Sequence, residues 1–75
     1  MQLNDEVRER IDTIIGSNRV VLFMKGTPEM PQCGFSAATL GVLDALVPDY
    51  ATFNVLEDQT VREGIKAFSD WPTIP

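Results

Sequence analysis

The 75-residue sequence has no histidine and only one cysteine, Cys33. The absence of histidine excludes Cys–His catalysis and histidine-containing metal sites within the chain. A single cysteine excludes a framework of internal disulfides, so any disulfide must join Cys33 to another molecule. This cysteine usage is typical of a protein from a reducing compartment.

Positive charge is also scarce. The chain has 6 Lys and Arg against 11 Asp and Glu, which gives a net charge of -5. Since nucleic acids are bound by clustered Lys and Arg, we expect no nucleic-acid partner. No apolar run approaches membrane-spanning length and residues 1–6 are polar and acidic, so we expect no membrane partner. We expect a cytoplasmic protein, or an organelle-matrix protein whose transit peptide has been removed.

A length of 75 residues with 44% hydrophobic residues allows one small domain, residues 1–75. Hydrophobic spacing predicts that helices and strands alternate along it. The first helix follows an N-cap at Asn4 and ends at residues 16–18, and its apolar face comprises Leu3, Val7, Ile11, Ile14 and Ile15. Residues 20–24 form a continuous apolar run, which predicts a buried strand of a parallel sheet. Residues 51–56 are rich in β-favouring residues and predict a second strand.

The spacing of Thr60 and Glu63 fits a capping box at the start of a third helix. Its inward stripe is predicted to comprise Val61, Ile65 and Phe68. A strand, helix and strand series of this length predicts a parallel crossover. Ligands of such sheets gather beyond the carboxyl ends of the strands, where the loop that carries Cys33 should lie.

Cys33 stands at the predicted start of the central helix. The apolar residues behind it recur at helical spacing, and Pro48 ends the run: Phe35, Ala38, Val42, Leu43 and Leu46. Unpaired N–H groups and the positive end of the helix dipole favour a thiolate at this position. The alternative is that Cys33 is a small buried hydrophobe. The neighbouring Pro31, Gln32 and Gly34 favour a surface turn, so we expect a reactive or metal-ligating thiol.

Half of the six basic residues come from segments expected near Cys33: Lys25, Arg62 and Lys66. Arg62 and Lys66 are four residues apart and share a helix face. Each alone reads as ordinary surface charge. Together, in an acidic chain, they indicate a pocket for a small anion, and Arg62 has the paired donors that clamp a carboxylate.

Three stretches carry a family resemblance: Lys25-Gly26-Thr27-Pro28 with Pro31, then Cys33-Gly34-Phe35-Ser36, and later Trp71-Pro72-Thr73-Ile74-Pro75. They resemble the signature of the monothiol, CGFS-type glutaredoxins. The resemblance implies an α/β, thioredoxin-like (glutaredoxin) fold in incomplete form, a helix-strand-helix-strand-helix series with a parallel strand pair. The family's C-terminal hairpin, Gly-Gly-Cys-Asp turn and last helix are then missing, and the strand at residues 20–24 should lack a neighbour on one side.

The resemblance also implies residue roles. It assigns glutathione contacts to Lys25, Arg62, Lys66, Thr73 and Ile74. Pro75 resembles the cis-proline of thioredoxin-like folds, which presents the backbone of the preceding residue to an extended peptide. Phe35 is expected beneath the site or along the glutathione cleft.

Two chemistries follow from one thiolate beside glutathione. The resemblance implies that a dimer binds and transfers a [2Fe-2S] cluster, with Cys33 of each chain and two glutathione thiolates as ligands. Iron–sulfur clients or BolA-like proteins are the implied partners. The alternative is glutathione-dependent disulfide oxidoreduction with Cys33 as the catalytic residue, a weak activity at most in this family. A plain interaction domain is the third possibility.

Overall fold

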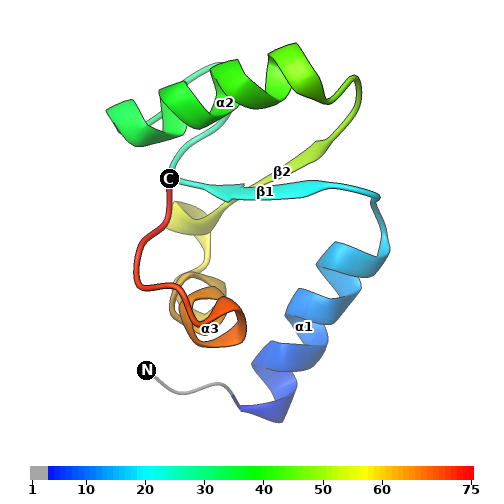
Figure 1. Cartoon of the computed structure of the whole chain (residues 1–75). Helices are drawn as coiled ribbons and strands as arrows, with labels where there is room; N and C mark the ends of the chain where they lie inside the picture. Colours follow the sequence, from blue (N-terminus) through cyan, green and yellow to red (C-terminus); the bar gives the residue numbers. More distant parts are fainter. Residues whose placement is uncertain (1–3) are drawn as a thin grey trace.

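The computed structural model describes residues 4–75, and helices and strands alternate along them. The elements are α1 (Asp5–Gly16), β1 (Val21–Met24), α2 (Gly34–Leu46), β2 (Ala51–Asn54), the 3-10 turn η1 (Val55–Glu57) and α3 (Gln59–Ser69). β1 and β2 pair in parallel, from Val21 opposite Ala51 to Met24 opposite Asn54. α2 covers one face of this sheet, and α1 and α3 lie on the other (Figure 1). The predicted order of elements and the parallel strand pair are confirmed.

Each face of the sheet has its own apolar cluster, because successive side chains of a strand point to opposite sides. Towards α2, Leu22 and Met24 of β1 form a buried cluster with Leu40. On the other face, Phe23 and Phe53 pack against the cluster formed by α1 and α3. Their ring centroids are 5.8 Å apart. The sheet therefore packs against α2 on one face and against α1 and α3 on the other.

The cluster between α1 and α3 contains most of the predicted inward residues. The predicted stripe of α3 meets that of α1 there: Val7, Ile11, Val61, Ile65 and Phe68. Ile14 is half-buried, whereas Ile15, expected on the same face, is 38% exposed. Leu3, also assigned to this face, lies outside the described residues. The inward stripe of α3 is confirmed.

Asn4 caps α1 as predicted. Its side-chain oxygen accepts a hydrogen bond from the main-chain N–H of Val7 at 2.9 Å, which satisfies one of the unpaired donors at the start of the helix. Asp5 and Glu6 follow in the first turn, where their negative charges interact favourably with the positive end of the helix dipole.

The N-cap of α3 differs from the prediction. Asp58, not Thr60, caps this helix, and its Oδ1 accepts hydrogen bonds from the main-chain N–H groups of Thr60 and Val61, both at 3.1 Å. The Thr60 hydroxyl also donates to Asp58 Oδ1 at 2.7 Å. Glu63 pairs with Lys66 at 3.1 Å instead of reaching back to the cap. The capping-box prediction was wrong because an aspartate two residues upstream competes for the same N–H groups.

The second strand is shorter than predicted, since β2 ends at Asn54 and residues 55–57 form η1. The Asn54 side-chain oxygen accepts from the N–H of Leu56 at 3.0 Å, which caps the 3-10 turn. It also accepts from the N–H of Gly26 at 2.9 Å. These bonds stop the extended conformation that the β-favouring residues Val55 and Leu56 would otherwise continue.

The buried face of α2 also differs from the prediction. Phe35, Val42 and Leu46 are 55%, 57% and 75% exposed, and Ala38 is exposed too. Ser36 and Leu40 are buried instead, and Leu43 is half-buried. Because α2 carries apolar residues all round, its spacing alone does not indicate which face meets the sheet. Contact between Leu40 and the β1 residues Leu22 and Met24 determines which face of α2 is buried.

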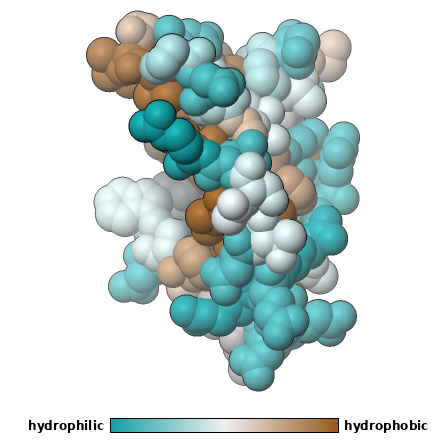
Figure 2. All heavy atoms as spheres, turned by 90° about the vertical axis from the view of Figure 1, so that its right-hand side faces the viewer, coloured by the Kyte–Doolittle hydropathy of each residue, from teal (hydrophilic) through white to brown (hydrophobic). Residues whose placement is uncertain are grey.

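The surface reflects this difference between helices. Figure 2 shows mostly hydrophilic residues over the lower part of the molecule, where α1 lies, and a mixture of hydrophobic and hydrophilic residues at the top, over α2. Large apolar side chains are also exposed outside α2, at Ile15, Met30, Leu56 and Trp71. Within residues 4–75, no helix has both the length and the apolar character needed to cross a membrane.

β1 is paired with a strand on one side only within the described part of the chain, because the sheet has the order β1-β2. The segment after α3 returns to the end of β1 (Figure 1), where the Lys25 N–H donates to the carbonyl of Pro75 at 2.7 Å. Apart from this contact, the outer edge of β1 has no paired strand among residues 4–75.

Candidate functional site

Cys33 is the N-cap residue of α2. Its backbone is extended (φ -155°, ψ 160°), and the main-chain N–H of Ser36 donates to its sulfur at 3.3 Å. The Ser36 hydroxyl oxygen lies 3.4 Å from the same sulfur. Cys33 is half-exposed, so its thiol is accessible to other molecules. The predicted place of the cysteine at the start of a helix is confirmed.

These contacts stabilise the thiolate. Hydrogen bonds from the Ser36 hydroxyl and the Ser36 main-chain N–H hold the pKa of the Cys33 thiol below its ordinary value. Partial desolvation acts against them, and the positive charge of Lys25 adds a smaller favourable contribution. The thiolate is the form that attacks disulfides and binds metals. The sequence pointed to the helix terminus, whereas the larger contribution comes from the Ser36 side chain.

Ser36 lies beside the Cys33 sulfur, and the sequence analysis assigned it no role. Its side chain is fully buried, and its hydroxyl donates to the carbonyl of Lys25 at 3.1 Å. A polar residue three positions after an N-cap lies where the cap atom meets a main-chain N–H. That spacing was the available signal, but it does not indicate that the serine is buried beside the sulfur.

The loop between β1 and Cys33 is held by short-range hydrogen bonds. The Gln32 N–H donates to the Lys25 carbonyl at 2.9 Å, and Thr27 and Met30 exchange main-chain bonds at 3.0 and 3.2 Å. Gly26 has a φ of +94°, and a Cβ there would lie 2.5 Å from the Met30 carbonyl oxygen. Only glycine fits this position without strain. The loop thereby brings Cys33 back to the end of β1, beside Lys25.

A second group of predicted residues lies around a small apolar cavity. This cavity of about 250 Å³ is lined by Phe23, Ile65, Lys66, Ser69, Trp71, Thr73, Ile74 and Pro75. Three of the predicted glutathione contacts, Lys66, Thr73 and Ile74, therefore share one cavity, and Pro75 lies there with them. Cys33 does not line it, but the Lys25–Pro75 main-chain hydrogen bond links the cavity to the loop that carries Cys33.

The remaining predicted residues lie outside this cavity. Arg62 is half-buried in the first turns of α3 and is not among the lining residues. Phe35 follows Cys33 in α2 and is 55% exposed, so its ring is not buried beneath the site. Lys66 is engaged with Glu63, with the Lys66 ammonium nitrogen 3.1 Å from the carboxylate oxygen.

The prediction of a cis peptide bond before Pro75 was wrong, since no peptide bond within residues 4–75 is cis. The Pro75 carbonyl reaches the Lys25 N–H with a trans bond. Ile74 is 5% exposed, and its side chain belongs to the cluster between α1 and α3. These two contacts place the segment against β1 without a cis bond.

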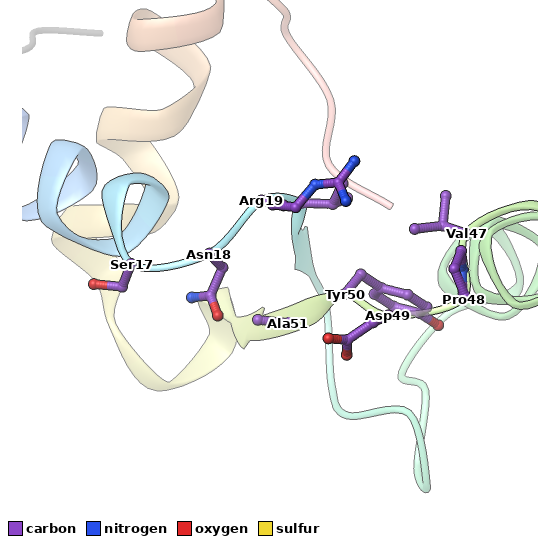
Figure 3. A pocket seen from close by; sticks show the side chains of 9 residues that line it. Ser17, Asn18, Arg19, Val47, Pro48, Asp49, Tyr50 and Ala51 are labelled. Atoms are coloured by element: carbon purple, nitrogen blue, oxygen red, sulfur yellow. The ribbon is translucent and has the colours of Figure 1, made fainter.

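Another cavity, of about 400 Å³, lies at the opposite end of the sheet. Figure 3 shows its lining, from the loop before β1 and the loop between α2 and β2: Ser17, Asn18, Arg19, Val20, Val47, Pro48, Asp49, Tyr50 and Ala51. A hydrogen bond to Asp44 raises the pKa of Tyr50 there. The lining carries no thiol, so we place the candidate site at Cys33.

Metal binding at Cys33 requires ligands from other molecules. Within residues 4–75, no three Cys, His, Asp or Glu side chains are close enough together to hold a metal ion. Cys33 supplies one soft sulfur donor, the type of ligand that iron–sulfur clusters take. Gly34, next to it, has no side chain, and a Cβ there would meet no heavy atom within 4 Å outside residues 33–35 and the backbone of α2. A single sulfur donor fits a cluster whose other ligands come from outside the chain.

Comparison with known proteins gives a consistent family. The family model described as glutaredoxin matches residues 20–75. The chain is 58% identical to "Monothiol glutaredoxin-5, mitochondrial" of Saccharomyces cerevisiae over 100% of this chain and 52% of that protein. It is 45% identical to "Monothiol glutaredoxin-S7, chloroplastic" of Oryza sativa subsp. japonica over 97% of this chain and 44% of that protein.

A solved structure gives the same result. The NMR structure of the mature form of Trypanosoma brucei 1CGrx1 matches with a TM-score of 0.77 and 44% identity, over 95% of this chain and 52% of that one. The chain therefore spans about half the length of the relatives it matches.

Proposed function

Because this chain belongs to the glutaredoxin family and its relatives are named monothiol glutaredoxins, we propose that it binds a [2Fe-2S] cluster with glutathione and passes it to client proteins. The cluster is cargo in this proposal. One observation supports it most strongly: the only thiol of the chain is half-exposed and is held by Ser36 in a way that favours the thiolate.

The count of ligands leads to an assembly. A [2Fe-2S] cluster takes four thiolates, and one chain supplies one of them. Two chains and two glutathione molecules complete the set, so we propose a homodimer bridged by the cluster. Gly34 supports this arrangement, because the residue after the cysteine adds no side chain next to the sulfur.

Glutathione is proposed to bind along the segment between Cys33 and the small apolar cavity. Lys66, Thr73, Ile74 and Pro75 line that cavity, and Lys25 pairs with Pro75 next to the Cys33 loop. Lys66 offers a positive charge to a glutathione carboxylate, in competition with Glu63. Arg62, four residues before Lys66 on α3, is proposed to clamp a second carboxylate.

The second candidate function is glutathione-dependent disulfide oxidoreduction, and the stabilised thiolate favours it too. The Cys33 thiolate attacks the glutathione sulfur of a mixed disulfide, so a new disulfide forms and the substrate leaves as a thiolate that takes a proton from water. A second glutathione thiolate then attacks the glutathione sulfur bound to Cys33. Glutathione disulfide forms, and Cys33 leaves as the thiolate. This would be a weak activity beside cluster carriage.

A location and protein partners belong to the same proposal. We propose an organelle matrix as the location, which is supported by relatives whose printed names are mitochondrial or chloroplastic. Iron–sulfur client proteins and BolA-like proteins are the proposed protein partners. Residues 1–75 are proposed to be the N-terminal part of one glutaredoxin domain.

Anaerobic reconstitution with iron, sulfide and glutathione tests the main proposal. We expect a coloured species with two irons per pair of chains, and no colour when Cys33→Ser is used or when glutathione is omitted. A colourless monomer from the unmodified chain would reject cluster carriage. If the unmodified chain then turned over a small glutathione mixed disulfide and Cys33→Ser did not, the oxidoreductase would remain as the supported function.

The glutathione contacts need a separate test. Arg62→Ala is expected to weaken glutathione binding in calorimetry and to shorten retention of the cluster without lowering the unfolding midpoint. Arg19→Ala is the matched control, because Arg19 lines the cavity at the other end of the sheet. Equal binding by both variants would refute the assigned clamp.

A further inference from the structure

The Ser36 hydroxyl has one proton and two acceptors within reach. It donates to the Lys25 carbonyl at 3.1 Å, and the Cys33 sulfur lies 3.4 Å away. The side chain is fully buried, so solvent does not compete for this proton. The direction of the hydroxyl therefore depends on which of the two acceptors is more negative.

The Lys25 carbonyl does not depend on Ser36. The Gln32 N–H also donates to it, at 2.9 Å. If the hydroxyl turns away, the carbonyl keeps one partner, so no buried acceptor is left unsatisfied. Turning from the carbonyl to the sulfur therefore costs little.

We propose that Ser36 is a positioning residue whose hydroxyl turns from the Lys25 carbonyl to the Cys33 sulfur whenever Cys33 leaves as a thiolate. This inference rests on the proposed oxidoreductase chemistry and names the group that assists its second step. In that step the attacking thiolate forms a bond to the glutathione sulfur, the bond to Cys33 breaks, and the electron pair remains on the Cys33 sulfur. The hydroxyl then joins the Ser36 N–H as a second donor to that sulfur.

The same hydrogen bond affects the two steps in opposite directions. A stabilised thiolate is a better leaving group and a weaker nucleophile. Ser36 should therefore speed release of Cys33 from its glutathione mixed disulfide and slow attack by an already ionised Cys33. Damage to the fold would not produce changes of opposite sign, so the pair of rates separates a positioning role from a structural one.

The test uses Cys33 that has been converted to its glutathione mixed disulfide with glutathione disulfide. Release by 2-mercaptoethanol is followed by mass spectrometry, so the result does not depend on recognition of glutathione or on iron. For Ser36→Ala we expect release to be roughly two- to tenfold slower, the range for loss of one hydrogen bond. Attack on glutathione disulfide, at a pH where the thiol is fully ionised, should be unchanged or faster.

Two other variants serve as controls. Ser36→Thr keeps the hydroxyl and should restore release. Ser17→Ala removes a hydroxyl that donates to the Thr13 carbonyl at 2.8 Å, away from Cys33, and should match the unmodified chain in both steps. The proposal would be overturned if Ser36→Ala released Cys33 from its glutathione mixed disulfide at the same rate as the unmodified chain. It would also be overturned if both release and attack were slower in Ser36→Ala.

The unmodified chain provides a check that needs no folded variant. The carbonyl carbon resonance of Lys25 should differ between the thiolate and the glutathione mixed disulfide, because the Ser36 hydroxyl returns to that carbonyl when the sulfur loses its charge. An unchanged resonance would contradict the turning hydroxyl. Failure of cluster reconstitution would leave these predictions intact, so the two proposals fail separately.

Discussion

Replacement of Asp58 by alanine should destabilise the chain through α3. The carboxylate accepts hydrogen bonds from two N–H groups at the start of the helix. Loss of such a cap costs about 1 kcal/mol. Asp58 also pairs with Arg10 at 2.8 Å, but the Arg10 side chain is 53% exposed, so this ion pair contributes about 0.5 kcal/mol. We therefore expect the free energy of unfolding to fall by about 1.5 kcal/mol.

Urea denaturation followed by circular dichroism measures this loss. With a slope of about 1 kcal/mol per molar urea for a small domain, the midpoint should fall by about 1.5 M. Asp58→Asn keeps the acceptor and loses only the ion pair, so its cost should be about 0.5 kcal/mol or less. Thr60→Ala should cost under about 0.5 kcal/mol, because Thr60 is not the cap. If Thr60→Ala were as costly as Asp58→Ala, the capping assignment would be refuted.

Three further predictions concern stability and use the same assay. Gly26→Ala should lower the free energy of unfolding by more than about 1 kcal/mol, because Gly26 has a positive φ and a Cβ there would meet the Met30 carbonyl. Gly41→Ala, with open space in the middle of α2, should raise the free energy of unfolding by roughly 0.5–1 kcal/mol. Equal effects of the two substitutions would contradict the loop geometry. Leu40→Ala should cost about 2–5 kcal/mol and Leu46→Ala under about 0.5 kcal/mol, and the reverse order would show that the other face of α2 is buried. Hydrogen bonds from Thr60 and Val61, together with the charge of Arg10, hold the pKa of Asp58 below its ordinary value. The contribution of Asp58 to the free energy of unfolding is therefore complete above its pKa in the unfolded chain and is lost as the pH falls through its pKa in the folded chain. Asp58→Asn should remove this pH-dependent part of the stability, and an unchanged pH profile of stability would refute the reasoning.

The order of elements could be predicted because each segment has a clear period or a continuous apolar run. The stripe of α3 is one example, since Val61, Ile65 and Phe68 recur on a helix whose other positions are polar or small. The face of α2 could not be predicted in this way. Its residues are apolar on most sides, and the buried side is chosen by contact with β1, which spacing within the helix does not encode.

The predicted boundaries of helices and strands were wrong where a polar side chain forms a hydrogen bond with nearby main chain. Asn54 ends β2 and Asp58 begins α3, each by accepting N–H groups two or three residues ahead. Such local bonds compete with strand and helix propensities, and several adjacent residues had the chemistry to make them.

The site was predicted in part. The position of Cys33 followed from the helix signal, and the structure confirms it. The role of Ser36 did not follow, because its effect on the sulfur depends on burial and on the Lys25 carbonyl, which belongs to another element. The cis bond before Pro75 was taken from a family resemblance and is absent from residues 4–75.

Native mass spectrometry of the reconstituted protein tests the central claim most directly, because it counts every ligand donor in one species. The proposal predicts two chains, two glutathione molecules and one [2Fe-2S] cluster, since each chain has a single thiol. A cluster held by one chain alone, or by two chains without glutathione, would contradict it.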